Sequence, residues 1–132
     1  MDTTRQFSSH EAARLAGITF RQLDYWCRIG TVRPAVEARG SGSWRRWTWQ
    51  QVMVLAVLAR VGGHARISLL DELATVLGDW SADEWDATTL LVGESGIWTP
   101  DDGDAPPVAI AVNLAAIARE VEARAAALVV AA

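Results

Sequence analysis

The residues with the clearest chemical potential are arginines in the first half of the chain. All twelve basic residues of this 132-residue sequence are arginine. Residues 1–66 hold ten of them against four acids, a net charge of +6, whereas residues 67–132 hold two against twelve, a net charge of -10. A guanidinium group is a planar fork of donors that fits phosphate oxygens or a guanine edge. The overall charge of -4 therefore hides a basic half suited to nucleic acid.

Other chemistries have little support. Cys27 is the only cysteine, which excludes an intrachain disulfide and a multi-thiolate zinc site, and its apolar helix face predicts a buried thiol. His10 and His64 have no third metal ligand at a useful spacing. We expect no catalytic residue, metal or cofactor. No apolar stretch has the length of a signal peptide or a membrane span, so the expected location is the cytoplasm, on the nucleoid, without membrane contact.

The elements that must position the arginines begin at recognisable caps. A Ser or Thr followed three residues later by Glu or Gln forms a capping box, and such boxes start at Ser8, Thr19, Thr48 and Ser81. The first two predict helices over 9–16 and 20–29 with a short glycine-containing turn between them, the pattern of a helix-turn-helix. Further helices are predicted over 49–61, over 69–77 with Ser68 as cap, over the short turn 82–86, and over 114–130 with Asn113 as cap.

Short extended segments complete the expected fold. Thr31–Arg33 and Ser43–Thr48 flank a turn at 40–42 and predict a β-hairpin wing. Three more strands are predicted over 88–92, 96–99 and 108–112. The fold class is therefore α+β and mostly helical. We expect an N-terminal winged helix-turn-helix over residues 1–78 and a small acidic strand-and-helix module over 79–132.

Several spaced motifs occur together in the first 77 residues. An aromatic pair, Tyr25-Trp26, lies on the second predicted helix, Gly30 and Pro34 follow it, and the wing strand carries Trp44-Arg45-Arg46-Trp47. In this order the motifs resemble the DNA-binding domain of the MerR family of transcriptional regulators. The resemblance implies a dimeric protein that reads double-stranded DNA. Residues 79–132 resemble no effector domain of the family.

The sequence also departs from the family pattern. Asp24 replaces an arginine that faces the DNA backbone in many members, and we expect it to turn away or to pair with Arg21 or Arg28. The long dimerisation helix that typically follows the domain is not evident. The metal-sensing cysteines of some members are absent, which argues against thiolate metal sensing.

The residues and the resemblance point to one candidate interface. The N-terminal end of the second helix would enter the major groove, where Arg21 can pair with guanine or phosphate and Gln22 with adenine. The resemblance implies that the Tyr25 hydroxyl contacts a phosphate, and the wing arginines would reach the flanking backbone or minor groove. The predicted DNA-binding residues are Thr19, Phe20, Arg21, Gln22, Tyr25, Arg39, Ser43, Arg45 and Arg46.

The acidic half leaves more alternatives open. The apolar stripe of the last helix is a candidate dimerisation surface, formed by Leu114, Ile117, Val121 and Leu128. Trp80, Trp85 and Trp98 either fill a small core, which we favour, or line a ligand pocket.

The leading functional hypothesis is a dimeric, sequence-specific regulator of transcription, bacterial or from a phage. One alternative is a DNA-architectural recombination directionality factor of the excisionase type. Another is a DNA-anchored adaptor whose C-terminal module binds a protein partner or a small ligand. Inverted repeats in the DNA site would favour the regulator, and direct repeats the architectural protein.

Overall fold

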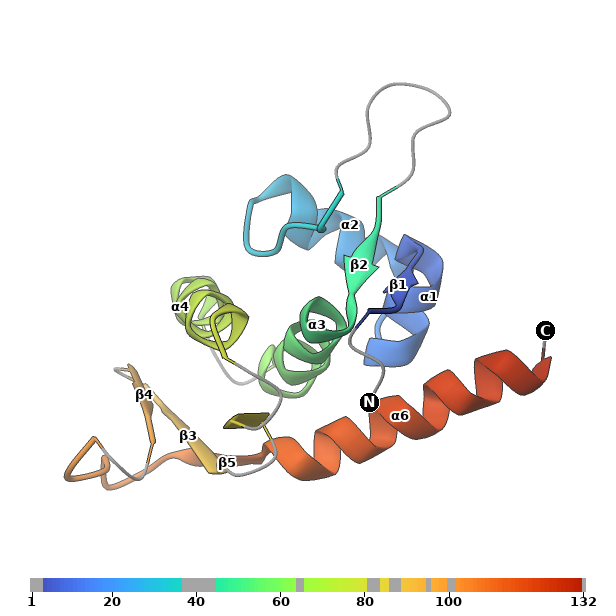
Figure 1. Cartoon of the computed structure of the whole chain (residues 1–132). Helices are drawn as coiled ribbons and strands as arrows, with labels where there is room; N and C mark the ends of the chain where they lie inside the picture. Colours follow the sequence, from blue (N-terminus) through green and yellow to red (C-terminus); the bar gives the residue numbers. More distant parts are fainter. Residues whose placement is uncertain are drawn as a thin grey trace.

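Helix α3 (Trp49–Val61) forms the centre of the fold. Its sequence is apolar almost all round, and Trp49, Val61 and the continuous run from Val52 to Leu58 are buried. A helix without a polar face needs neighbours on every side. Accordingly, α1 (Ser9–Ala16), α4 (Ile67–Gly78) and α6 (Leu114–Ala131) all contact α3, as Figure 1 shows.

The computed structural model describes residues 4–36, 45–63, 66–80, 84–85, 89–94, 96–99 and 102–131, and the side chains of 129–131 are left out. The fold is α+β and mostly helical, as the sequence predicts. The remaining elements, in chain order, are β1 (Gln6–Phe7), α2 (Phe20–Arg28), β2 (Trp47–Thr48), β3 (Thr89–Gly93), β4 (Gly96–Trp98) and β5 (Ile110–Asn113).

Two predicted capping boxes are present in full. The backbone N–H of Ser8 donates to Glu11 Oε1 at 2.9 Å, while the Glu11 N–H donates to Ser8 Oγ at 3.2 Å. Thr48 and Gln51 exchange the same pair of bonds at the start of α3. Because each bond joins residues three apart, the sequence was sufficient to find them. The box predicted at Ser81 lies outside the described residues.

The prediction for the start of α4 was wrong. The helix begins at Ile67 with Arg66 as its N-cap, and no side chain caps it. The N–H groups of Leu69 and Leu70 both donate to the Arg66 carbonyl, which closes the first turn two residues before the predicted start. Ser68 therefore lies inside the first turn and does not cap the helix.

Strand pairing also differs from the expected wing hairpin. β2 pairs antiparallel with β1, with Phe7 opposite Trp47, and the sequence analysis missed β1. The 31–33 segment forms no strand. Within the described residues of this region, 31–36 and 45–48, the linker that follows α2 meets the wing strand at an isolated antiparallel bridge between Val36 and Arg46. Both Phe7 and Trp47 are completely buried where the two strands pair. The burial of this apolar area favours the pairing of β2 with β1.

A three-stranded antiparallel sheet forms the C-terminal part, in the order β4-β3-β5. β3 and β4 lie close to the predicted ranges. The third strand begins at Ile110, not at 108, because Val108 is 83% exposed and lies outside the ladder. Leu90 of β3 and Val112 of β5 lie opposite each other and both are buried.

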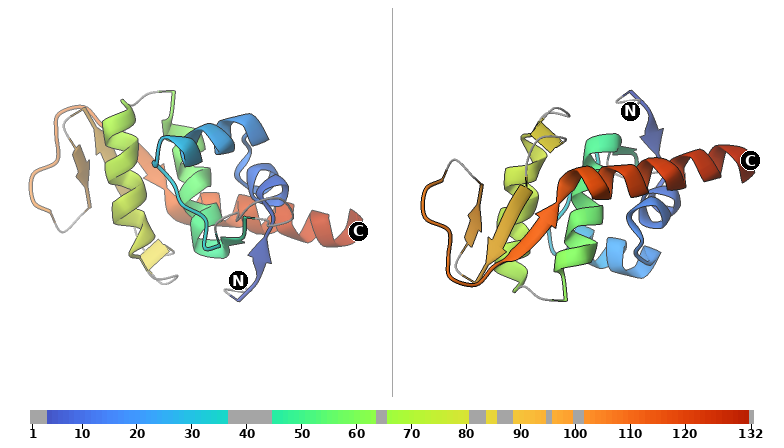
Figure 2. Two further views of the ribbon diagram at one scale, coloured as in Figure 1. Left: turned by 90° about the horizontal axis from the view of Figure 1, so that it is seen from above. Right: turned by 90° about the horizontal axis from the view of Figure 1, so that it is seen from below.

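Helix α6 leaves this sheet and crosses both α3 and α1 (Figures 1 and 2). Asn113 caps it as predicted, since its Oδ1 accepts the N–H of Ala116 at 3.0 Å. Leu114, Ile117 and Val121 are buried in the same hydrophobic cluster as the α1 and α3 residues, with Leu128 packed against it. The stripe predicted for dimerisation is thus engaged within the chain.

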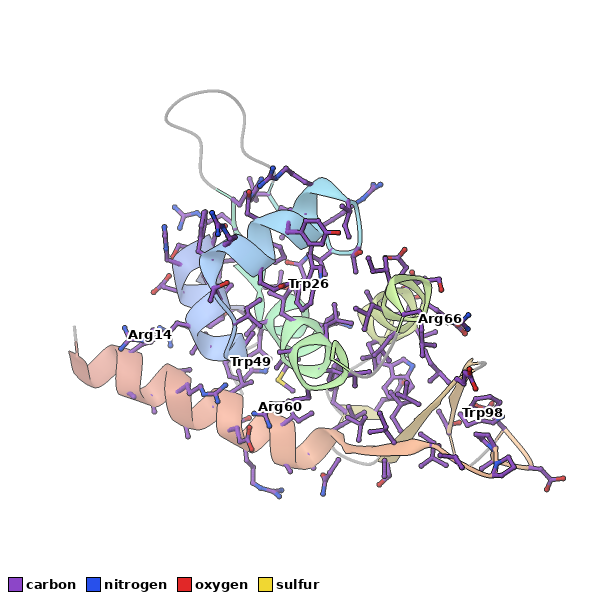
Figure 3. All side chains as sticks on the ribbon, turned by 180° about the vertical axis from the view of Figure 1, so that it is seen from behind. Arg14, Trp26, Trp49, Arg60, Arg66 and Trp98 are labelled. Atoms are coloured by element: carbon purple, nitrogen blue, oxygen red, sulfur yellow. The ribbon has the colours of Figure 1, made fainter. Side chains whose placement is uncertain are left out.

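Polar contacts fix α6 at two further points. Arg60 of α3, labelled in Figure 3, forms an ion pair with Glu120. Arg124 donates from Nη1 to the carbonyl of Leu15 at 2.9 Å. Leu15 lies in the last turn of α1, where carbonyls lack helical partners and a cation is favourable. The end of the acidic segment therefore stabilises the first helix of the basic one.

Tryptophans of the C-terminal half contribute to this core. Trp85 is fully buried, and its ring meets Trp80 edge-on at a centroid distance of 6.4 Å. Trp98, labelled in Figure 3, is half-buried on β4. The sequence favoured a core-filling role for these tryptophans, and the burial of Trp85 agrees with that role. Cys27, predicted to be buried, is only partly so.

Candidate nucleic-acid interface

Helices α1 and α2 form a helix-turn-helix with a three-residue turn. α1 ends at Gly17, whose φ of +81° lies in the left-handed region that glycine adopts without strain. Thr19 then caps α2, its Oγ1 accepting the N–H of Gln22 at 3.1 Å. The glycine thus ends α1, and the threonine starts α2.

Helix α2 has one buried face and one open face. Leu23 and Trp26 are buried against the core. The opposite face exposes Arg21 together with Phe20 and Tyr25, which are 41% and 45% exposed. Large apolar and aromatic side chains on an open face are typical of a binding surface. Of the five predicted contact residues on this segment, Thr19, Phe20, Arg21 and Tyr25 are exposed and Gln22 is half-buried.

A residue that the sequence analysis did not select lies beside this face. The His10 imidazole stacks on the Phe20 ring, with centroids 4.3 Å apart and an interplanar angle of 14°. His10 belongs to the first turn of α1 and is exposed. The stack brings the starts of the two helices together. No local pattern connects residues ten positions apart on different helices, so the sequence carried no signal for it.

The base of the wing lies next to α2. The Ala35 N–H donates to the Arg46 carbonyl at 2.8 Å, and the Arg46 N–H donates to the Val36 carbonyl at 3.0 Å. Arg46 is exposed. The Trp47 indole donates to Ser9 Oγ at 3.0 Å and so joins the wing strand to the start of α1. Two predicted contact residues, Arg39 and Ser43, lie outside the described residues.

An ionic network links α2 to the wing base. Asp24 Oδ2 accepts from Arg28 Nε at 3.1 Å and from its Nη2 at 2.8 Å, while Oδ1 accepts from Arg45 Nη1 at 2.9 Å. These bonds, first that from Arg45 and then those from Arg28, hold the pKa of Asp24 below its ordinary value. The expected pairing with Arg28 is present, and Arg45 is the second partner in place of Arg21.

The charge asymmetry of the sequence becomes a spatial one. In Figure 1, α2 and the wing base lie on one side of α3, while the sheet and α6 lie on the other. The first side carries the exposed arginines 21, 28 and 46; the second carries exposed acids that include Glu94, Asp104 and Glu122. A polyanion is therefore attracted to the α2 side and repelled by the opposite side.

Among the described residues, no group of three or more His, Cys, Asp or Glu side chains could hold a metal ion. None of the helices in the described part of the chain is both long and apolar enough to cross a membrane.

Comparison with known proteins supports the helix-turn-helix. A stretch of 51 residues is 45% identical to proteins named as uncharacterized HTH-type transcriptional regulators, from Mycobacterium bovis and from two strains of Mycobacterium tuberculosis. The stretch makes up 38% of this chain and 23% of each relative. The chain thus spans less than a quarter of the curated relatives it matches. No family model matches the chain.

Proposed function

We propose that this chain is a sequence-specific, DNA-binding regulator of transcription, with α2 as its recognition helix. The observation that carries the proposal is the open face of α2, where Arg21 lies between the exposed aromatic residues Phe20 and Tyr25, directly after the cap at Thr19. An arginine near the start of such a helix can donate two bonds to a guanine in the major groove. The similarity to proteins named HTH-type transcriptional regulators agrees with this proposal.

The finer proposal is a MerR-like mode of binding. It rests on the motifs of residues 7–48 and on the position of Arg46 at the wing base, from which a guanidinium would reach the phosphate backbone. Under this proposal the wing fixes the orientation of the protein on DNA, while α2 distinguishes the bases.

Dimerisation is also proposed, because one recognition helix contacts only a few base pairs and two helices in successive grooves gain affinity together. Since Leu114, Ile117 and Val121 are buried within the chain, another surface must meet the second copy. The C-terminal end of α6 is the candidate. It projects past α1 in Figure 2, and Ala126 and Ala127 are exposed there.

The test begins with selection of a preferred duplex from a random-sequence library. Binding of the full chain to that duplex is then measured over a series of salt concentrations. Arg21→Ala should weaken binding by about 1–3 kcal/mol and relax the base preference. Arg46→Ala should weaken binding to all sequences and reduce the salt slope by about 0.9 for the lost phosphate contact.

Arg119→Ala is the matched control, because Arg119 is an exposed arginine on α6, away from α2. The proposal fails if no duplex is enriched, or if the Arg21 and Arg46 variants bind like the Arg119 variant. The symmetry of the selected site tests the finer points. Inverted repeats, together with a dimer in light scattering, agree with a dimeric regulator. Direct repeats favour the architectural alternative.

A further inference from the structure

The Asp24 network presents a physical puzzle if α2 binds DNA. Asp24 lies one turn from Phe20 and one turn from Arg28, on the row of α2 that borders the wing base. A carboxylate beside a phosphate backbone is repulsive and lowers affinity for every DNA sequence. Electrostatics alone would therefore favour a neutral or basic residue at this position.

The geometry gives the carboxylate a specific role. Its two oxygens accept hydrogen bonds from different arginines: Oδ1 accepts from Arg45 and Oδ2 from Arg28. Arg28 comes from the last turn of α2, and Arg45 directly precedes the residue whose backbone forms the wing bridge. The Asp24 side chain thus joins α2 to the wing base, through a bond to a residue that is 21 positions away in the sequence.

The exposures of the three side chains support this role. Asp24 is 27% exposed and Arg45 is 24% exposed, so their bond is partly shielded from water, whereas Arg28 is 71% exposed. A shielded charge-assisted bond fixes side-chain geometry better than one in open solvent. The ion pair with Arg45 joins α2 directly to the wing base, and the bonds from Arg28 hold the Asp24 carboxylate in the orientation that reaches Arg45.

We propose that Asp24 is a positioning residue, which fixes Arg45 and Arg28 relative to the recognition helix and so improves sequence discrimination while lowering general affinity for DNA. The inference rests on the proposed DNA-binding function. If the two arginines contact phosphates, their fixed positions allow one register of α2 on the duplex. Without the carboxylate that they share, the two arginines are held less firmly relative to α2. Phosphate contacts in other registers then become more accessible, so non-specific binding is kept and discrimination falls.

The experiment uses Asp24→Asn, which keeps the shape of the side chain and removes its charge. Affinities of the full chain are measured for the selected duplex and for a scrambled duplex of the same length. We expect Asp24→Asn to bind the scrambled duplex at least as tightly as the unmodified chain does. We expect the ratio of specific to non-specific affinity to fall by about two- to fivefold.

Glu72→Gln is the matched control, because it removes one exposed carboxylate from α4 and changes the net charge equally. It should change both affinities by the same factor and leave their ratio unchanged. The double variant Asp24→Asn with Arg45→Ala tests the route. Because Asp24 acts mainly through Arg45 and also holds Arg28, Asp24→Asn should lower the ratio less in the Arg45→Ala background than in the unmodified chain.

Two results would overturn the inference and leave the proposed function intact. One is an Asp24→Asn chain that binds both duplexes more tightly by the same factor, which would make Asp24 only a repulsive charge. The other is a full additional loss of discrimination when Asp24→Asn is combined with Arg45→Ala. A chain with unmodified sequence that prefers no duplex would instead refute the proposed function itself.

Discussion

Replacing Val121 by alanine tests whether α6 belongs to the core of the helix-turn-helix segment. Val121 is 0% exposed, and the change removes two carbon atoms, each worth about 0.8 kcal/mol of transfer free energy. The cavity left behind adds about 1 kcal/mol. The better helix propensity of alanine offsets about 0.5 kcal/mol. The free energy of unfolding should therefore fall by about 2 kcal/mol.

Val108→Ala is the control, since the same two carbons are removed from a side chain that is 83% exposed, and its effect should stay within about 0.5 kcal/mol. Urea unfolding is followed by circular dichroism and by tryptophan fluorescence at two protein concentrations. With an m-value of about 2 kcal/mol/M, Val121→Ala should lower the midpoint by about 1 M in both signals.

Two outcomes would refute this reasoning. In one, Val121→Ala lowers the midpoint no more than Val108→Ala does. In the other, the midpoint of the unmodified chain depends on protein concentration and the Val121 variant loses that dependence, which would place the side chain between two copies.

Three further predictions concern single positions. Gly17→Ala should destabilise the fold by about 1–2 kcal/mol and lower the melting temperature, because φ is +81° and the new Cβ would lie 3.0 Å from the Arg124 guanidinium. Gly63→Ala is its control: there is open space around Gly63, so this change should have little effect on the melting temperature. Ser8→Ala should cost about 1 kcal/mol in urea unfolding, whereas Ser68→Ala, which removes no cap, should cost less than about 0.5 kcal/mol. The pKa of Asp24 in the folded chain is lowered from 3.8, so its ion pairs stabilise the fold above pH 3.8 and this stabilisation is lost as the pH falls through the folded pKa. The difference in unfolding free energy between the unmodified chain and Asp24→Asn, measured from pH 7 to pH 2.5, should therefore shrink in acid. A difference that stays constant would contradict the ion-pair assignment.

Much of the secondary structure could be predicted because its signals are local. The caps at Ser8 and Thr48 involve residues three positions apart, and Gly17 marks a turn that requires a left-handed residue. The start of α4 could not be found this way, because no side chain caps it. The serine pattern at Ser68 therefore favoured the wrong residue.

The candidate interface was found only in part. The exposed residues at the start of α2 follow from helix periodicity, since Leu23 and Trp26 define the buried face and leave Arg21 outside. His10 and the Asp24–Arg45 bond were missed. The first contact joins residues that are 10 positions apart and the second joins residues that are 21 positions apart. No local pattern in a single sequence shows that residues at such separations meet.

The sequence by itself determined the division of charge and the helical register, because both depend only on residue type and short-range spacing. It also determined that the stripe of Leu114 and Val121 must be buried. Only the tertiary structure decided that the stripe packs against α1 and α3 of the same chain. The hydrophobic effect is non-directional, so an apolar stripe specifies burial, whereas the choice of partner depends on the shape of the whole fold.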